Sequence, residues 1–304
     1  MTTNQHNQFE RLVQKFAPQS KLLRSWELKG GVSAQVTALE IERPGGPIAK
    51  MIVRQHGPVD LEHNPQIAAD EFKLLQLLQS AGLATPTPYG FDQSGEIFAT
   101  PYIVIEYVDG QPEFAPSDIN KATAQLAAHL ASVHAIECTK ADLSFLPSQE
   151  DIYARKLQDQ PAQLDEILDE GRIRNTLEES WPLPQRNAPV LLHGDFWPGN
   201  VLWKNGELVA VIDWEDAKTG DPLADLANSR LEILWAFGID AMQLFTEQYK
   251  SSTAIDFTDL PYWDLWAALR PAGKLSEWAG DEETAQVMRE KHRLFLSRAY
   301  AELA

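Results

Sequence analysis

Cysteine and positive charge are both scarce in this sequence. Its 304 residues contain a single cysteine, Cys138, so no internal disulfide can form, which is typical of proteins in a reducing compartment. Lys and Arg number 26 against 44 Asp and Glu, and the formal net charge is −18. Nucleic-acid binding needs a basic footprint, so we expect no nucleic-acid partner. A cationic substrate would be compatible with this charge.

Long apolar segments are absent as well. The first ten residues, MTTNQHNQFE, are polar and lack the apolar core of a secretory signal peptide. No uninterrupted apolar stretch reaches the roughly 20 residues that a transmembrane helix needs. Together with the low cysteine content, these features predict a soluble cytoplasmic protein that does not associate with membranes. Nothing in the sequence indicates an oligomeric state.

The first hundred residues are predicted to consist mainly of strands. Strand-like composition, rich in β-branched and aromatic residues at 102–108, and a turn signal at residues 43–47 indicate strands at residues 22–28, 35–42, 48–54 and 102–108. One helix is expected within residues 64–82, because its apolar side chains recur at helical spacing.

Helical patterns dominate from Ser117 onward. This serine is a suitable capping residue for a helix over residues 117–137, and residues 151–184 are expected to be helical in pieces. A β-rich part followed by a helical part predicts an α+β protein of two lobes, residues 1–108 and 109–304. Asp109 and Gly110 form the expected hinge.

The segment LLHGDFWPGN, residues 191–200, brings polar and aromatic residues into one turn, and a hairpin signal follows it. Asn205-Gly206 lies between two apolar runs, which predicts a two-residue turn. In that register Asp213 is the diagonal neighbour of Asn200, at about 7–8 Å between Cα atoms. Two oxygen ligands at this spacing suit Mg²⁺, which also binds substrate phosphates. The spacing therefore predicts a magnesium site at Asn200 and Asp213, with Asp195 close by.

A purely structural role is the alternative for these polar residues. Asp and Asn are common in turns, which accounts well for Asn205. It accounts less well for Asp213, which ends the apolar run LVAVI and precedes Trp214.

The motifs HGDFWPGN and VIDWEDAKTGDPLADLA resemble those of the aminoglycoside phosphotransferase family, whose members are small-molecule kinases with a protein-kinase-like fold. The core of the resemblance covers residues 191–227, and weaker correspondences extend over most of the chain. It implies a bilobal fold with a β-rich nucleotide-binding lobe and a helical lobe that carries the catalytic loop and the acceptor site. The implied activity is transfer of the γ-phosphoryl group of ATP, with Mg²⁺, to a hydroxyl of an amino sugar, amino alcohol or related metabolite.

The resemblance also implies roles for single residues of the central motifs. His193, Asp195 and Asn200 match the kinase pattern H-x-D followed by four residues and Asn. Asp195 would orient the attacking hydroxyl, and Asn200 would bind a metal ion together with Asp213. For Glu215, in the segment Asp213-Trp214-Glu215, two alternatives stay open: a further contact to the metal ion, or a side chain that is merely solvated.

Bracing and shielding roles are expected for other residues near the loop. His193 and Asp225 are expected to brace it by hydrogen bonds, and Asp221 is a ready N-cap with Pro222 at the first helical position. Trp197 and Pro198 would stiffen the loop and shield the site, although Trp197 could equally pack under the C-terminal helices.

The first lobe supplies the implied nucleotide contacts. The segment KGGVSA, residues 29–34, lies where a phosphate-covering loop belongs, so Gly30, Gly31 and Ser33 would approach the phosphates, although two glycines between strands also suit a plain hairpin. Arg54 ends the next strand and would hold phosphate oxygens.

Two further nucleotide contacts are implied, at the helix and at the end of the last strand. Glu71 would position Arg54, with Asp70 as the competing partner and a surface salt bridge as the alternative. The backbone groups of Glu106, Tyr107 and Val108 would meet the adenine edge.

The acceptor is less well defined. The segment PYWDLWAALRPAGKLSEWA contains Trp263 and Trp266, whose rings can hold quaternary amines, whereas Arg270 and Lys274 favour an anionic or polar acceptor. Helical spacing of Trp263, Trp266 and Arg270 is also that of an ordinary core. Acidic residues nearby, Asp264 and Glu277, could hold amino groups.

Three other classes of protein are weighed against a small-molecule kinase. A pseudokinase or nucleotide-binding regulator would be marked by loss of Asp195, Asn200 or Asp213, and all three are present. A metal-dependent hydrolase would need further histidine ligands, for which no spacing appears. A protein kinase would need a long activation segment, but only a short stretch separates Asp213 from Asp221.

Overall fold

The computed structural model describes residues 3–28 and 34–304. Gly30, Gly31 and Ser33, the expected phosphate-covering residues, lie outside the described residues. The chain divides into two compact units, residues 1–110 with 209–215 (unit 1) and residues 111–208 with 216–304 (unit 2). The sequence alone suggested one boundary after residue 108, without a return of the chain to the first unit.

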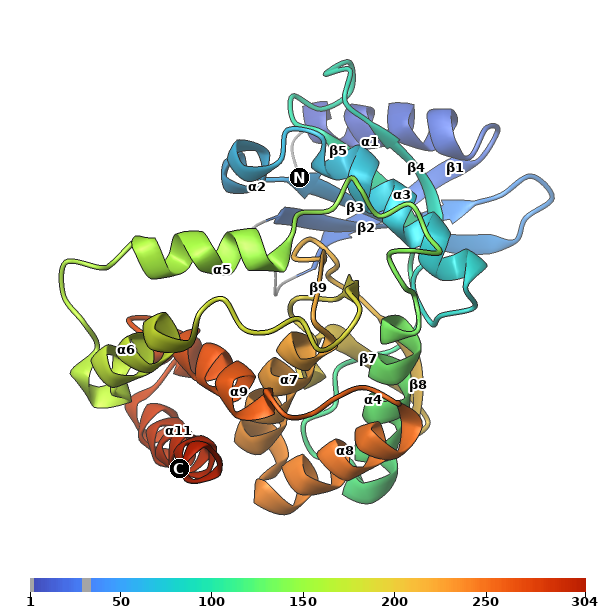
Figure 1. The fold of residues 1–304 in the computed structure, drawn as a ribbon. Helices are drawn as coiled ribbons and strands as arrows, with labels where there is room; N and C mark the ends of the chain where they lie inside the picture. Colours follow the sequence, from blue (N-terminus) through green and yellow to red (C-terminus); the bar gives the residue numbers. More distant parts are fainter. Residues whose placement is uncertain (1–2, 29–33) are drawn as a thin grey trace. The chain divides into compact units, whose positions relative to one another are not determined.

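Unit 1 contains an antiparallel sheet with the strand order β1-β2-β3-β5-β4 (Figure 1). Its strands are β1 (Lys21–Glu27), β2 (Ala34–Glu42), β3 (Ile48–His56), β4 (Pro88–Asp92) and β5 (Tyr102–Glu106). Its helices are α1 (Thr3–Phe16), α2 (Pro58–His63) and α3 (Ile67–Ser80).

Strand β3 is buried on both faces, and this places Arg54. Met51 and Val53 alternate toward a core that they share with Leu12 of α1. The intervening residues Ile52 and Arg54 therefore point to the opposite face of the sheet. There Arg54 meets α3, through a hydrogen bond to Glu71. A charged side chain thus enters the buried second face of the sheet, where it requires ionic partners.

Three elements of unit 1 were missed by the sequence analysis. In α1, Phe9, Leu12 and Val13 are buried at helical spacing within a polar segment. Helix α2 is short and begins at a proline. No strand was predicted at residues 88–92, but they form β4, an edge strand that begins at Pro88. Proline is tolerated at the start of an edge strand because no ladder hydrogen bond is lost there.

Unit 2 is mainly helical. Its α-helices are α4 (Ile119–His134), α5 (Gln149–Gln158), α6 (Glu170–Ser180), α7 (Pro222–Phe237), α8 (Ile239–Ser252), α9 (Leu260–Leu269), α10 (Leu275–Ala279) and α11 (Glu282–Leu303). Short 3-10 turns are η1 (Glu166–Leu168) and η2 (Pro198–Asn200), and its short strands are β6 (Val190–Leu192), β7 (Val201–Lys204) and β9 (Lys218–Gly220). Strand β8 (Glu207–Val211) begins in unit 2 and ends in unit 1.

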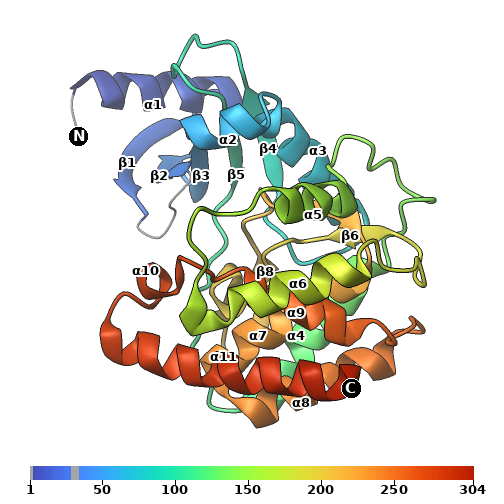
Figure 2. The same cartoon turned by 60° about the vertical axis from the view of Figure 1, so that its left-hand side comes forward.

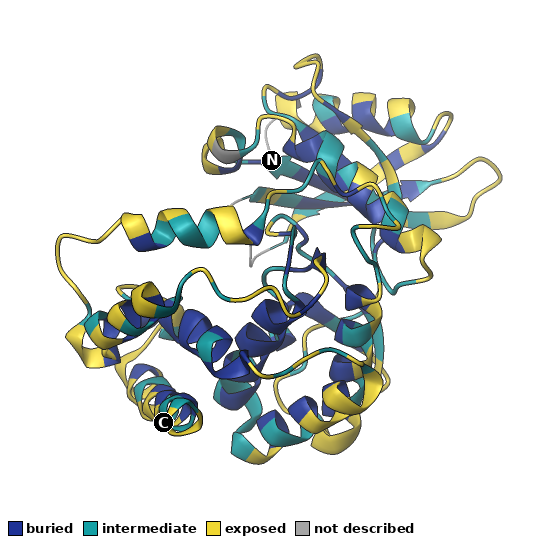
Figure 3. Cartoon of the chain, viewed as in Figure 1, coloured by how far each residue is buried: buried dark blue, intermediate teal, exposed yellow. Residues whose placement is uncertain are grey.

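Helix α7 lies at the centre of unit 2. It packs against α8 and α9, and α9 in turn packs against α11 (Figure 2). Nearly all of α7 and α9 is buried, as Figure 3 shows. As predicted, Asp221 caps α7 by accepting a hydrogen bond from the backbone N–H of Leu223, and Pro222 follows it. The expected cap of α4 was wrong by one residue, because Asp118 and not Ser117 accepts from the backbone of this helix.

The predicted hairpin after the central motif is present. Strands β7 and β8 are joined by Asn205 and Gly206, whose φ angles are 54° and 75°. Two successive positive φ values define the kind of tight turn that Asn-Gly favours, because both residues tolerate the left-handed region.

Within the described ranges, no helix combines the length and apolar character that crossing a membrane requires.

Candidate active site

The loop that follows β6 carries the expected catalytic residues of unit 2. Strand β6 pairs with β9, with Val190 opposite Gly220 and Leu192 opposite Lys218. The chain then turns sharply at Gly194, where φ is 83°. A Cβ atom at this position would lie 2.1 Å from the carbonyl oxygen of Asp216, so only glycine fits without movement of the backbone.

The side chain of Asp225, on α7, holds this loop through hydrogen bonds to its backbone. Its carboxylate accepts hydrogen bonds from the backbone N–H groups of His193 (2.6 Å) and Gly194 (2.9 Å). Burial opposes the negative charge, but the hydrogen bond and charge of His134 outweigh it, and the pKa of Asp225 is lowered. The prediction that Asp225 braces the loop is confirmed. His193 also acts within the loop, because its Nδ1 accepts from the backbone N–H of Asp195 at 3.2 Å.

The carboxylate of Asp195 is held by two side chains. Its Oδ1 accepts from Nη2 of Arg270 at 2.9 Å, and its Oδ2 accepts from Nδ2 of Asn200 at 3.1 Å. The same Nδ2 donates to the backbone oxygen of Asp195 at 3.0 Å, which orients the amide with Oδ1 as its remaining acceptor. The side chain of Asp195 is 29 % exposed, so it is both fixed in orientation and open to a substrate.

Arg270 has a partner, Asp195, that the sequence did not reveal. It follows α9, and the sequence suggested for it only a role in the acceptor region. Burial disfavours its charge, but the carboxylates of Asp195 and Glu232 keep the pKa of Arg270 above its usual value. Burial raises the pKa of Glu232 to about 7, while Arg270 opposes and Asp195 adds to this shift. Carboxyl groups with strongly perturbed pKa values are concentrated at functional sites, although structural ion pairs also produce them.

In unit 1, Arg54 is the centre of an ionic cluster. Its Nη1 donates to Oε1 of Glu71 at 2.8 Å, and its Nη2 donates to Oδ1 of Asp213 at 2.8 Å and to Oε2 of Glu215. The predicted pair of Arg54 and Glu71 is confirmed, whereas Asp70 instead accepts from Asn64. Burial opposes the charge of Arg54, but its acidic partners raise its pKa overall.

The segment that carries Asp213 is anchored within unit 1. The backbone N–H of Val211 donates to the carbonyl oxygen of Ala84 at 2.8 Å, and the indole N–H of Trp214 donates to the carbonyl oxygen of Val211 at 3.1 Å. Between these anchors Asp213 has a φ of 67°, in the left-handed region. Such strain in a residue other than glycine persists only where the surroundings enforce it, and it is concentrated at functional sites.

We expect the Glu71→Gln variant to be less stable than the wild-type chain by about 1.5–3 kcal/mol, because a buried charge-assisted hydrogen bond is weakened. Both side chains are largely buried, with 8 % exposure for Arg54 and 5 % for Glu71. The matched control is Asp70→Asn on the same helix, for which we expect a loss below about 0.5 kcal/mol. Urea unfolding would measure both losses. Equal losses would contradict the assignment of Glu71 as the partner that supports Arg54.

The residues expected to bind magnesium carry side-chain oxygen atoms that suit this ion. Asn200 offers an amide oxygen and Asp213 a carboxylate, both of which are ligands that Mg²⁺ accepts. Around Arg54, the carboxylates of Glu71, Asp213 and Glu215 all lie within ion-pair distance of one guanidinium group. In the described part of the chain, no group of three or more His, Cys, Asp or Glu is arranged to hold a metal alone. Each of the two expected ligands, taken within its own unit, therefore has a donor atom that suits an ion which also relies on phosphate oxygens, and their joint binding of Mg²⁺ stays a prediction.

The expected adenine contacts lie at the end of β5. The side chain of Glu106 accepts from the backbone N–H and the hydroxyl of Thr87, at 3.1 and 2.7 Å. The carbonyl oxygen of Val108 accepts from the backbone N–H of Gly110 at 3.1 Å, so the chain turns at the predicted hinge. The role of this segment in binding adenine stays a prediction.

Two of the four aromatic residues of the expected acceptor segment belong to the core. Trp263 and Trp266 are 3 % and 1 % exposed, and Trp266 stacks on Tyr153 with ring centroids 4.0 Å apart. Asp264 is also buried and forms an ion pair with Arg230 at 3.0 Å. These three residues are thus structural, in line with the core alternative.

The other residues considered for the acceptor region are partly or fully exposed. Glu277 is exposed, and Trp197 is half-buried with its ring against that of Phe114. Arg270 and Lys274 line a pocket of unit 2 and remain as candidates for the acceptor site.

Three features follow one another along the chain: a sheet with a buried Arg–Glu pair, a helical part with a braced loop that contains Asp195, and then Asp213. This order is that of the protein-kinase-like phosphotransferases. A family model described as "Phosphotransferase enzyme family" matches residues 27–266, which is more than half of the chain. The chain belongs to this phosphotransferase family.

A solved structure and two curated relatives illustrate the likeness. The GDP complex of aminoglycoside 2'-phosphotransferase-IIIa has a TM-score of 0.68 and 17 % identity, over 98 % of this chain and 99 % of that one. This likeness confirms the predicted α+β, bilobal, protein-kinase-like fold. Acyl-CoA dehydrogenase family member 10 of Mus musculus is 27 % identical over 59 % of this chain and 18 % of its own length. Member 11 of Rattus norvegicus is 25 % identical over 72 % of this chain and 32 % of its own. The chain therefore spans less than a third of the length of these two relatives.

Proposed function

We propose that this protein transfers the γ-phosphoryl group of ATP, with Mg²⁺, to a hydroxyl group of a small molecule. The observation that carries the proposal is the geometry of Asp195, whose carboxylate is oriented by Arg270 and Asn200 and remains partly exposed. A fixed carboxylate of this kind can accept a hydrogen bond from an attacking hydroxyl and align it.

The other residues are assigned to nucleotide and metal binding in this proposal. When bound, Mg²⁺ would neutralise charge on the transferring phosphate. Asn200 and Asp213 would hold the ion, each through a side-chain oxygen. Arg54 would hold phosphate oxygens through its forked donors while Glu71 keeps it in place.

Further nucleotide contacts complete the assignment. Gly30, Gly31 and Ser33 would cover the phosphates, and the backbone near Glu106 and Val108 would meet the adenine. A solved structure of similar fold carries GDP, which supports a nucleotide site in general.

The proposal extends to partners and location. The acceptor would be a small hydroxyl compound, for which the sequence suggested amino sugars, amino alcohols and related metabolites. The charge of −18 supports the absence of a nucleic-acid partner, and we propose that no membrane takes part. The single cysteine supports a cytoplasmic location.

The test is acceptor-dependent release of ADP by the purified chain, with Mg-ATP and a panel of hydroxyl compounds. We expect turnover that requires both an acceptor and Mg²⁺, so that EDTA abolishes it. Mg-ATP should also stabilise the folded protein, by about 2.7 kcal/mol at a hundredfold excess over its Kd. Parallel assays with GTP would establish the preferred nucleotide.

Two results would contradict the proposal in different ways. Stabilisation by Mg-ATP without turnover on any acceptor would favour a nucleotide-binding regulator. Absence of any nucleotide effect on stability or turnover would exclude both an active kinase and a nucleotide-binding regulator.

A further inference from the structure

Unit 2 contains a pocket that adjoins the candidate catalytic residue. Its volume is about 630 Å³, within the range that small-molecule ligands occupy. Four basic residues line it, namely Lys156, Arg174, Arg270 and Lys274. Arg270 belongs both to this pocket and to the catalytic loop, because its Nη2 contacts Asp195. The guanidinium group of Arg270 therefore lies between the pocket and the carboxylate of Asp195, which would accept a hydrogen bond from the attacking hydroxyl.

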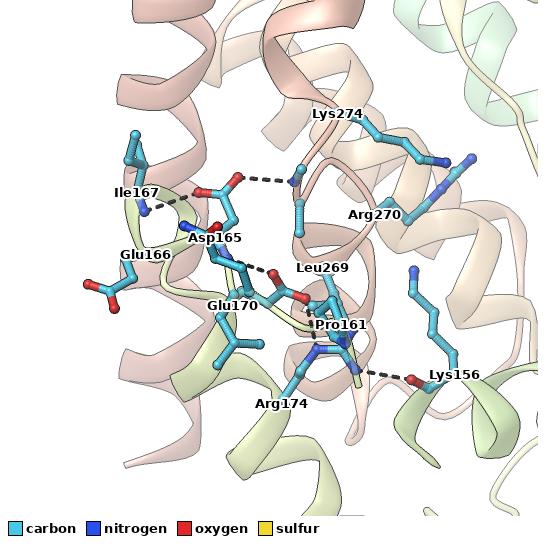
Figure 4. Close-up of a pocket in the computed structure, with 14 residues that line it drawn as sticks. Lys156, Pro161, Asp165, Glu166, Ile167, Glu170, Arg174, Leu269, Arg270 and Lys274 are labelled. Carbon is cyan, nitrogen blue, oxygen red and sulfur yellow. Dashed lines mark hydrogen bonds and ion pairs between the residues drawn. The ribbon is translucent and has the colours of Figure 1, made fainter. Parts of the chain in front are cut away.

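Three of the four basic residues lie on one side of the pocket, whereas Arg174 is bound to Glu170. Figure 4 shows Lys156, Arg270 and Lys274 on this side, and the acidic residues on the other. Across residues 3–28 and 34–304, the ammonium groups of Lys156 and Lys274 form no ion pair with a carboxylate. The Nη1 atom of Arg270 is buried and has no hydrogen-bond partner within those same ranges. Unsatisfied donors of this kind are costly unless a ligand accepts from them.

The acidic residues of the pocket are already engaged or turned away. Asp165 accepts from the backbone N–H groups of Ile167 and Leu168 and also from that of Gly273, so both its oxygens have donors. Glu170 binds Arg174 at 2.8 Å and also accepts from the backbone N–H of Asp165.

Glu166 is the remaining acid of the pocket lining. It is exposed, and its carboxylate points away from the basic side in Figure 4. The uncommitted charge of the pocket is therefore positive, although the whole chain carries −18.

We infer that this pocket binds a carboxylate or phosphate group of the acceptor, while the hydroxyl of the same molecule meets Asp195. The inference rests on the proposed phosphotransfer and narrows its substrate class to anionic hydroxy compounds. A polyamine would place its positive charges beside Lys156, Arg270 and Lys274, where like charges repel. Lys156 and Lys274 are thus assigned as specificity-determining residues, and Arg270 as the link between the anion and the catalytic carboxylate.

The ionisation of Lys156 is consistent with this assignment. Burial and the positive charges of Arg270, Arg174 and Lys274 lower the pKa of Lys156 to about 8, while Glu170 opposes part of the shift. A bound anion would favour the charged form and raise this pKa again. Binding between pH 8 and 9 should therefore take up protons, whereas binding near pH 6.5 should not.

The experiment compares acceptors that differ only in charge. Isothermal titration would measure binding of ω-hydroxyalkanoates, hydroxyalkyl phosphates, diols and amino alcohols of equal chain length to the full chain. We expect the carboxylates or the phosphates to bind at least about tenfold more tightly than the diols, and the amino alcohols to bind least. The comparison of the two anionic series identifies which group the pocket prefers. Titrations in buffers of different ionisation enthalpy would report proton uptake.

Variants link the effect to the named residues. The double variant Lys156→Met, Lys274→Met keeps the apolar stems and should lose the preference for anions by about tenfold or more, without changing the affinity for diols. The control Lys140→Met removes an equal kind of charge from a residue outside the pocket lining and should bind as the wild type does. Equal binding of anionic, neutral and cationic compounds, or an unchanged double variant, would overturn the inference. If anions bind in a way that depends on both lysines but no ADP is released, the anion-binding pocket would be supported and the proposed phosphotransfer would be contradicted.

Discussion

The Asp195→Asn variant is expected to lose acceptor-dependent turnover by about a hundredfold to ten-thousandfold, which is the range for removal of a general base. Asparagine has nearly the same shape and can still accept a hydrogen bond from Arg270 or Asn200, so the loop should remain folded. It cannot accept the proton of the attacking hydroxyl, however, and its neutral amide aligns the hydroxyl poorly. Steady-state kinetics with a saturating acceptor would measure the loss in kcat.

Two controls separate catalysis from folding in this variant. Mg-ATP should stabilise Asp195→Asn as much as the wild type, because the nucleotide contacts are assigned to other residues. Asp240→Asn removes the same charge from an exposed residue of α8 and should turn over as the wild type does. Full activity of Asp195→Asn would show that the aligning group has been misassigned.

The Gly194→Ala variant is expected to be destabilised by about 3–5 kcal/mol. Its φ of 83° is strained for alanine, and the new Cβ would lie 2.1 Å from the carbonyl oxygen of Asp216 and 2.7 Å from Cε of Lys218. The lysine side chain can move, but the carbonyl belongs to the segment that leads into β9. Relief of the clash would separate β6 from β9 or shift the catalytic loop, so turnover should fall together with stability.

Gly206→Ala provides the matched control for this prediction. Its φ is 75°, but no atom lies within 4 Å of the added Cβ. Only the conformational strain then applies, and we expect a loss of about 1 kcal/mol. Midpoints of urea unfolding and thermal melting for both variants would separate the strain from the clash. Equal losses for the two substitutions would contradict the close approach of Gly194 and Asp216.

Features determined by short segments were predictable from the sequence. The Asn205-Gly206 turn depends on two residues that tolerate positive φ, and it appears in the structure. The cap at Asp221 and the brace at Asp225 also lie in one short motif, and both interactions are present. The pair of Arg54 and Glu71 was implied by the resemblance to the phosphotransferase family, and it is present in the structure.

Features that depend on distant parts of the chain were not predictable. Arg270 meets Asp195 across 75 positions, and no local signal distinguishes it from other residues that follow a helix. Ser117 and Asp118 are both good caps, and the choice between them depends on where the helix actually begins. Helix α1 was overlooked because its few apolar residues are spread through a polar segment, although their spacing is helical.

The assembly of unit 1 from two separated segments matters to anyone who wishes to dissect the protein. A fragment that stops at residue 110 would retain Arg54 and Glu71 but would lack Asp213 and Glu215, together with the Val211 hydrogen bond to Ala84. Its guanidinium would then be buried with only one of its carboxylates. A self-sufficient version would need residues 209–215 fused to residues 1–110 through a new linker, rather than a single cut at the hinge.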